Sequence, residues 1–240
     1  MSEKLVVNTY SPSGIPMYWE HKEFARQLKA AGCIIKSDGL VEYKSKTQSG
    51  MHRVGEYFFN LRQLHRMSQT PYFIQAYMEF IEQKILDSLN VKLFQIAIKG
   101  VANGSIEFPQ LLSKEIGVPF IPTTKDKQGM LQVGAELGLY MRQRSAILIV
   151  EDVLNSGTSA KELFKLLNDL QPNVSLAMLY GVSRGNITNW NEFPFSIKKP
   201  ERVFCMCEVR APSYDPSKLP KHLHARRIIK YDSPEHPKNS

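Results

Sequence analysis

The chain has 240 residues, of which 42% are hydrophobic and 22% charged, and a formal net charge of +8 at pH 7. This composition is typical of a globular protein, and the excess of cations requires either an anionic partner or a role in solubility. The longest apolar runs, such as Ala146–Val150, are far shorter than the roughly 20 residues of a membrane-spanning helix. The first residues contain no apolar stretch of the kind found in secretory signals. We therefore expect a cytoplasmic protein that does not contact membranes.

The three cysteines, Cys33, Cys205 and Cys207, are an odd number and lack Cys-x-x-Cys spacing. This argues against a disulfide scaffold and against a zinc ribbon. Because free cysteines are usually buried, we expect Cys205 and Cys207 to act as small apolar residues of a strand.

Two amphipathic helices are predicted in the first part of the chain. Apolar residues recur at helical spacing from Trp19 to Ala31, and Gly32 follows where a helix would end. A longer helix is predicted from Pro71 to Leu89, with proline at its start. We expect the aromatic side chains along one of its sides to be core residues.

Strands and helices alternate after the second helix. The predicted strands cover residues 93–98, 118–122, 146–150 and 174–182, and the predicted helices cover residues 105–117 and 158–170. A polar stretch is expected at residues 123–129. Alternation at this interval indicates crossover connections and a largely parallel sheet covered on both faces. The predicted fold class is therefore α/β.

The end of the chain differs in character. Residues 202–210 alternate with period two and predict one more strand. Five prolines follow between residues 212 and 237, which favours an irregular tail. From Lys198 to Ser240, 10 Lys or Arg residues stand against 5 Asp or Glu. More than half of the net charge therefore lies in this segment.

The turn after the strand at residues 146–150 is the best candidate for a binding site, because ligands of parallel sheets bind at the carboxyl ends of the strands. Glu151 and Asp152 follow this apolar strand, and a small polar loop, Asn155–Ser159, precedes a predicted helix. Such a loop offers N–H groups and hydroxyls to a phosphate, and the acid pair suits the hydroxyls of a neighbouring polyol. The alternative is a simple helix N-cap beside two solvated carboxylates.

The segment Ile147–Ser159 resembles the phosphoribosyl pyrophosphate (PRPP) signature of the type I phosphoribosyltransferases. The sequence has neither a Walker phosphate loop nor a Gly-x-Gly-x-x-Gly dinucleotide fingerprint. Further segments, in the family's order, are similar to those of the orotate phosphoribosyltransferases. They are Gly39–Ser45, Tyr57–Arg62, Lys99–Gly104, Val118–Gly129 and Tyr180–Arg184.

This resemblance implies the type I phosphoribosyltransferase fold, a mostly parallel α/β sheet flanked by helices. It implies a small N-terminal hood and base-binding region at residues 1–70, a PRPP-binding core at residues 71–211 and a basic, proline-punctuated tail at residues 212–240. The implied reaction transfers the phosphoribosyl group of PRPP to orotate, giving orotidine 5'-monophosphate and pyrophosphate in pyrimidine (UMP) synthesis. A homodimer is implied, because the family's catalytic loop comes from the neighbouring subunit.

The resemblance also implies roles for individual residues. Lys125, Asp126 and Asp152 would be catalytic, with Lys125 on a loop that closes over the departing pyrophosphate. The residues assigned to PRPP are Glu151, Asp152, Val153, Leu154, Asn155, Ser156, Gly157, Thr158, Ser159, Lys99, Gly100, Asn103, Gly104 and Lys125. Those assigned to orotate are Lys44, Phe58, Phe59, Asn155 and Arg184. Magnesium is the implied cofactor, held mainly through PRPP with no direct protein ligand.

Some positions depart from the family's pattern. Thr123 and Thr124 stand in place of an Arg-Lys pair, Asn155 in place of a threonine, and Ser183 in place of an acidic residue. Asn103 replaces a tyrosine. These departures leave the predicted fold unchanged and bear on the choice of base.

Alternatives follow from these departures. The chain is longer than the family's after Lys44, so a rival placement aligns Gln48 with the family's lysine. The protein could also be an enzyme for another base, or a PRPP-sensing regulator that binds nucleic acid through its basic surface. Lys44, Phe58 and Arg184 favour the orotate enzyme, and small anionic substrates account for the local cations. Nucleic acid is therefore not the expected partner.

Overall fold

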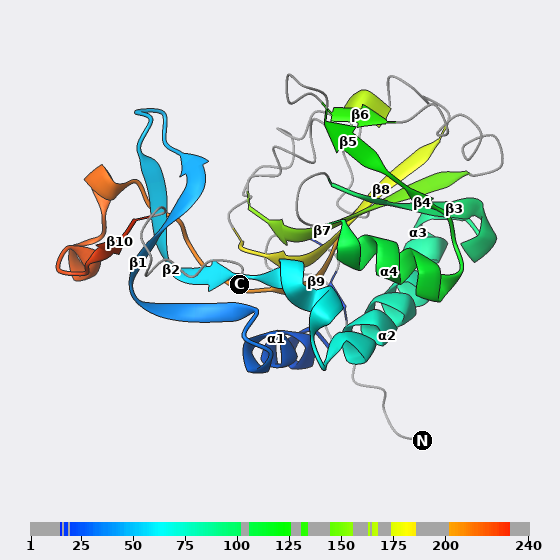
Figure 1. Ribbon diagram of the computed structural model, residues 1–240, viewed down its shortest axis with the longest axis horizontal. Coiled ribbons are helices and arrows are strands. Elements are labelled where there is room, and N and C mark those ends of the chain that lie inside the picture. Colours follow the sequence, from blue (N-terminus) through cyan, green and yellow to red (C-terminus); the bar gives the residue numbers. More distant parts are fainter. Residues whose placement is uncertain are drawn as a thin grey trace.

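A sheet with packed helices and a smaller β lobe beside it make up the computed structural model of the chain (Figure 1). The structure describes residues 15, 17–18, 20–101, 106–125, 131–133, 145–155, 163, 165–167, 174–185 and 202–230. At residues 44–45, 123–125 and 131–133 it describes the backbone alone.

The central sheet has five parallel strands in the order β4-β3-β7-β8-β9. These strands are β3 (Ile96–Gly100), β4 (Phe120–Ile121), β7 (Ala146–Leu154), β8 (Ser175–Ser183) and β9 (Val203–Glu208). Crossover connections between parallel strands require intervening segments of a dozen or more residues, which matches the spacing of the strands here. The predicted α/β class with a largely parallel sheet is confirmed.

Three helices cover one face of this sheet, as Figure 1 shows. They are α1 (His21–Ala30), α2 (Thr70–Phe80) and α4 (Glu107–Ile116). A π-helical turn, Ile81–Ile85, and α3 (Leu86–Leu89) continue α2, so the helix predicted from Pro71 to Leu89 is present with a local widening. Gly32 follows α1 with φ of +72°, a conformation that favours glycine and ends the helix there. Among the described residues, no helix is long and apolar enough to cross a membrane.

The core follows the alternation of side chains along the strands. On β7, Ala146, Leu148 and Val150 pack toward the three helices, whereas Ile147 and Ile149 pack on the opposite face. Leu163 and Leu167, from the predicted helix at residues 158–170, are buried on this second face. The aromatic residues of α2 and the cysteines of β9 are buried, as predicted: Phe73, Tyr77, Phe80, Cys205 and Cys207.

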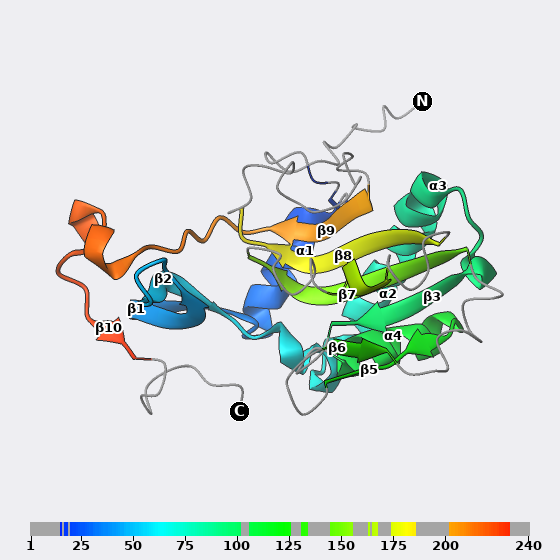
Figure 2. The same ribbon diagram turned by 90° about the horizontal axis from the view of Figure 1, so that it is seen from above.

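The smaller lobe is a β hairpin joined by the end of the chain. Its strands are β1 (Ile34–Lys46) and β2 (His52–Phe59), which pair antiparallel, and β10 (Ile228–Ile229), which pairs parallel with β1. A 3-10 helix, Leu61–Arg66, leads from β2 back to the core. Figure 2 shows the chain running from β9 to this hairpin.

The tail is largely irregular up to residue 230, as its prolines predicted, but it is packed against the body of the protein. Residues 211–230, here called the C-terminal segment, form two 3-10 turns and β10 and lie on the hairpin. Leu223 is buried there against Leu40 and Val54. The sequence pattern missed this because only a few apolar residues of the segment, spread among prolines and cations, make the contact.

Other boundaries differ from the predicted ones. β7 continues through Leu154, so the acid pair lies within a strand instead of a loop. Where a polar stretch was expected, β5 (Thr123–Lys125) pairs antiparallel with β6 (Leu131–Val133).

Gly181, on β8, has no room for a side chain. A Cβ atom there would lie 2.7 Å from Leu61 Cδ2, 2.8 Å from the Tyr77 hydroxyl and 3.0 Å from the Asp152 carbonyl oxygen.

We predict that Gly181→Ala lowers the free energy of unfolding by about 1–3 kcal/mol, as overpacking does, measured by urea denaturation. Ser175→Ala, at the start of the same strand, is the control. Equal unfolding midpoints for Gly181→Ala and the wild type would contradict this packing.

Candidate active site

The carboxyl ends of β3, β7 and β8 lie together at one edge of the central sheet. The register pairs Gly100 with Val150, and Leu154 with Ser183. The Arg184 backbone N–H donates to the Leu154 carbonyl at 3.0 Å, just beyond the ladder. Three predicted site segments, far apart in the sequence, therefore meet at this edge, as expected for a parallel sheet.

The acid pair, Glu151 and Asp152, lies in this edge region on β7. The Asp152 side chain is 22% exposed, and its Oδ1 accepts a hydrogen bond from the Val153 N–H at 2.8 Å. Burial raises the pKa of both carboxyls, and for Glu151 the neighbouring Asp152 charge raises the pKa further. Tyr180, opposite Glu151 on β8, and Tyr77, on α2, are the neighbouring hydroxyls. Both carboxyls are therefore partly buried, while the N-cap of the alternative interpretation lies largely outside the described residues.

Arg62 contributes a cation to the acid pair. It lies on the 3-10 helix after β2, and its Nε is 3.7 Å from Asp152 Oδ2. Its side chain is 42% exposed, so this is a weak ion pair rather than a buried one. The resemblance singled out the segment Tyr57–Arg62, but no spacing in the sequence signalled its contact with Asp152, because the two residues are 90 positions apart.

A small pocket lies beneath this ion pair, between the 3-10 helix, α2, α4 and β7. Apolar and aromatic side chains form most of its wall, and the acid pair and Arg62 close one side. The lining residues are Leu61, Arg62, Leu64, Tyr77, Phe108, Pro109, Val150, Glu151 and Asp152.

Lys99, predicted to help hold pyrophosphate, is fully buried on β3. Its Nζ donates to the carbonyl oxygens of Ile121 at 3.5 Å and Pro122 at 3.3 Å, at the end of β4. Burial lowers the pKa of Lys99 to about 8. The ammonium thus supports the backbone just before β5, and its contact with pyrophosphate stays a prediction.

Arg184, predicted to bind a substrate carboxylate, is buried at the end of β8 and only 4% exposed. Its Nε and Nη2 donate to the Ala211 carbonyl at 3.2 and 2.9 Å. Its guanidinium carbon lies 4.2 Å from the ring centre of Tyr43 and 5.2 Å from that of Phe59. Burial lowers the pKa of Arg184, but an arginine remains protonated in proteins. A solvated strand-end arginine, the alternative interpretation of this residue, is therefore wrong.

Phe58 and Phe59 point to opposite sides of β2, as alternation predicts. Phe59 packs against the core and against Arg184. Phe58 lies opposite Ile35 of β1, on the other face of the hairpin. The structure therefore associates Phe59 more closely than Phe58 with the predicted base site.

The remaining predicted residues are placed only in part. Lys44 lies on β1 and Lys125 on β5, with the backbone alone described. Leu154 packs its side chain in the core, so only its backbone could face a ligand. Gly100 ends β3, Val153 lies on β7, and Asn155 is the first residue after that strand. The predicted residues outside the described part of the chain are Asn103, Gly104, Asp126, Ser156, Gly157, Thr158 and Ser159.

Comparison with known proteins agrees with this geometry. A solved orotate phosphoribosyltransferase from Aeropyrum pernix superimposes with a TM-score of 0.52 at 18% identity, over 78% of this chain and 94% of that one. This chain has the type I phosphoribosyltransferase fold. The fold predicted from the PRPP-like signature is thus confirmed.

The chain is also similar in sequence to curated bacterial proteins. Orotate phosphoribosyltransferase from Neisseria gonorrhoeae is 29% identical over 116 residues, which is 48% of this chain and 52% of the relative. The enzyme of the same name from Neisseria meningitidis matches equally. The chain spans about half the length of the curated relatives it matches. No family model matches the chain.

The Arg62 ion pair predicts a pH-dependent effect on stability. In the folded protein Glu151 and Asp152 have raised pKa values. The free energy of unfolding therefore falls as pH rises from the usual carboxyl range toward these folded pKa values. Removing the Arg62 charge raises these pKa values further. In the ligand-free protein, Arg62→Gln should therefore lower the free energy of unfolding by up to about 1 kcal/mol at pH 8 and by less at pH 5.

Urea denaturation at the two pH values measures this difference. Arg66→Gln is the matched control, because Arg66 is exposed on the same 3-10 helix. Equal losses of stability at pH 5 and pH 8 in Arg62→Gln would show that the ion pair has no electrostatic role.

Proposed function

We propose that this protein is an orotate phosphoribosyltransferase, which transfers the phosphoribosyl group of PRPP to orotate and releases pyrophosphate. The observation that carries the proposal is the juxtaposition of the half-buried acid pair of β7 with the buried Arg184 of β8 at one sheet edge. One group suits the ribose hydroxyls and the other suits a carboxylate. The names of the curated relatives and of the Aeropyrum structure support the same substrates.

The acid pair would bind PRPP through its ribose. Glu151 and Asp152 would accept hydrogen bonds from the two ribose hydroxyls, which would offset the cost of ionising two adjacent carboxylates in a buried place. Asn155–Ser159 would hold the 5-phosphate with N–H groups and hydroxyls. The segment Lys99–Gly104 would hold the pyrophosphate.

The reaction breaks the bond from the anomeric carbon to pyrophosphate, and a nitrogen of the base replaces it with inversion. The transition state has oxocarbenium character, so the protein supplies positioning and charge stabilisation. Lys125, with Asp126 beside it, would neutralise the leaving oxygens. In a homodimer these two residues would act on the neighbouring subunit's site.

Arg184 would select a base that carries a carboxylate. Its Nε and Nη2 donate to the Ala211 carbonyl, and the Tyr43 hydroxyl also interacts with the guanidinium, so the backbone and the hairpin hold its charged end in place. The rings of Tyr43 and Phe59 fix the plane of the guanidinium. Lysine could not reproduce this planar geometry. Lys44 and Asn155 complete the proposed contacts to orotate, and Phe59 replaces Phe58 as the ring proposed to lie beside the base.

Magnesium would be held mainly by the oxygens of PRPP. Among the described residues, no group of three or more His, Cys, Asp and Glu side chains could hold a metal ion. When bound, magnesium would neutralise part of the pyrophosphate charge. The acid pair would orient the ribose, and Lys99 would keep the β4 end in place.

Turnover with orotate tests the proposal. With PRPP and magnesium, the purified full-length protein should consume orotate, seen as loss of its ultraviolet absorbance and release of pyrophosphate. Turnover with another base and none with orotate would retain the transferase and reject the choice of base. No turnover with any base, together with steep salt-dependent binding to RNA or DNA, would favour the regulator instead.

Substitutions in the proposed machinery give a second test. We predict that Asp152→Asn and Lys125→Ala each lower kcat/KM by at least about tenfold, because each removes a charge placed at the reacting centre. Asp87→Asn and Lys114→Ala, on α3 and α4, are the matched controls and should retain the wild-type rate. Rates unchanged in the first pair of variants would refute the assigned roles.

A further inference from the structure

The C-terminal segment is attached to the hairpin by backbone pairing along its length. Ile228 and Ile229 of β10 pair with Leu40 and Val41 of β1. Nearer its start, Tyr214 exchanges two backbone hydrogen bonds with Val54 of β2, at 3.0 and 2.7 Å. The segment therefore touches both strands of the hairpin.

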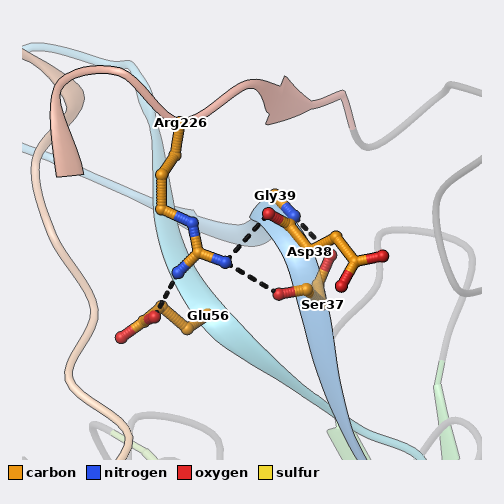
Figure 3. Close-up of polar contacts among 5 residues, drawn as sticks. All are labelled: Ser37, Asp38, Gly39, Glu56 and Arg226. Carbon is orange, nitrogen blue, oxygen red and sulfur yellow. Dashed lines mark hydrogen bonds and ion pairs between the residues drawn. The ribbon is translucent and has the colours of Figure 1, made fainter.

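Arg226 fastens this segment at an irregular point of β1. Its Nη2 donates to the carbonyl oxygens of Ser37 at 3.0 Å and Asp38 at 2.9 Å, and its Nη1 pairs with the Glu56 carboxylate of β2 (Figure 3). The β1–β2 register shifts between Lys36 and Val41, so Ser37 and Asp38 lie outside the regular ladder. The planar guanidinium thus links both strands of the hairpin where their own pairing is interrupted.

Gly39 allows this close approach. A Cβ atom on Gly39 would lie 2.6 Å from the Arg227 carbonyl oxygen, which accepts a hydrogen bond from the Leu40 N–H at 2.8 Å. Position 39 therefore requires glycine, because any side chain there would collide with the backbone of the C-terminal segment at Arg227.

The same segment reaches the proposed base site at its other end. It begins at Ala211, whose carbonyl oxygen accepts both hydrogen bonds of Arg184. Arg53 of β2 donates to the side chain and carbonyl of Ser213 at 3.0 and 2.7 Å. Tyr43 of β1 forms one face of the Arg184 environment. Of the groups that contact Arg184, Ala211 therefore belongs to the C-terminal segment and Tyr43 belongs to the hairpin. Arg226 links this segment to this hairpin.

We propose that Arg226 is a positioning residue for the base site. By holding the C-terminal segment on the hairpin, it keeps Ala211 and Tyr43 in the places that orient Arg184 toward a substrate carboxylate. This inference rests on the proposed function for the identity of that substrate. Arg226 does not touch the base, and it acts through Arg184.

Charge pairing supports a role inside the protein for these cations. Arg226 pairs with Glu56, and Lys230 pairs with Glu42 at 3.1 Å. The Arg226 side chain is 25% exposed, and its partner Glu56 is 26% exposed. Two of the tail's positive charges are therefore matched by carboxylates of the hairpin, which leaves fewer for an anionic macromolecule.

The test compares Arg226→Gln with Lys221→Gln in the full-length protein. Lys221 is exposed in the same segment and serves as the matched control. In the ligand-free protein, Arg226→Gln should speed hydrogen exchange of the Leu40 amide and of the Arg184 Nε–H by at least about tenfold. Lys221→Gln should leave both rates as in the wild type.

Steady-state kinetics provide the second readout. Arg226→Gln should raise the KM for orotate about fivefold or more, while the KM for PRPP and kcat stay within about twofold of the wild type. Unchanged exchange at Arg184 would overturn the proposal, and so would an equal rise of both KM values. If no base is turned over, the proposed function fails, and the exchange rate of Arg184 alone decides whether Arg226 positions it.

Discussion

The partial burial of two adjacent carboxylates at the end of β7 is the constraint on which the site depends. Loss of hydration raises the pKa of both groups in the ligand-free protein, and the neighbouring Asp152 charge raises the pKa of Glu151 further. The Val153 N–H, the Tyr180 hydroxyl and the weak ion pair with Arg62 oppose this rise. In the proposed function, the two ribose hydroxyls would donate to these carboxylates and so offset the cost of ionising them.

The cations of the site are supported in a different way. Lys99 and Arg184 are both buried, and both donate to backbone carbonyls instead of carboxylates. Carbonyl dipoles hold such groups in place without cancelling their charge, so the positive potential stays available to an anion. The parallel register of β3, β7 and β8 then sets the separation between acceptor and donor groups at the sheet edge.

Much of this arrangement follows from local sequence, and the rest depends on long-range contacts. Apolar runs predicted the strands around Ile147 and Leu179, and helical spacing predicted the long helix from Pro71, because these patterns are local. The Arg62 contact and the docking of the C-terminal segment join residues far apart in the chain, for which no spacing rule exists. The net charge of +8 illustrates this. Its excess in the tail suggested an external anion, whereas Arg226 and Lys230 are paired within the lobe.

The central claim is that the acid pair contributes ribose binding at the end of β7. The most direct test is isothermal titration calorimetry of the full-length protein in the absence of a base. It compares the affinity for PRPP with the affinity for pyrophosphate, each in the presence of magnesium. The account predicts one PRPP bound per chain, at least about tenfold more tightly than pyrophosphate, because hydrogen bonds to charged groups are each worth about 1.5–3 kcal/mol. Equal affinities for the two ligands, or no binding of PRPP, would contradict it.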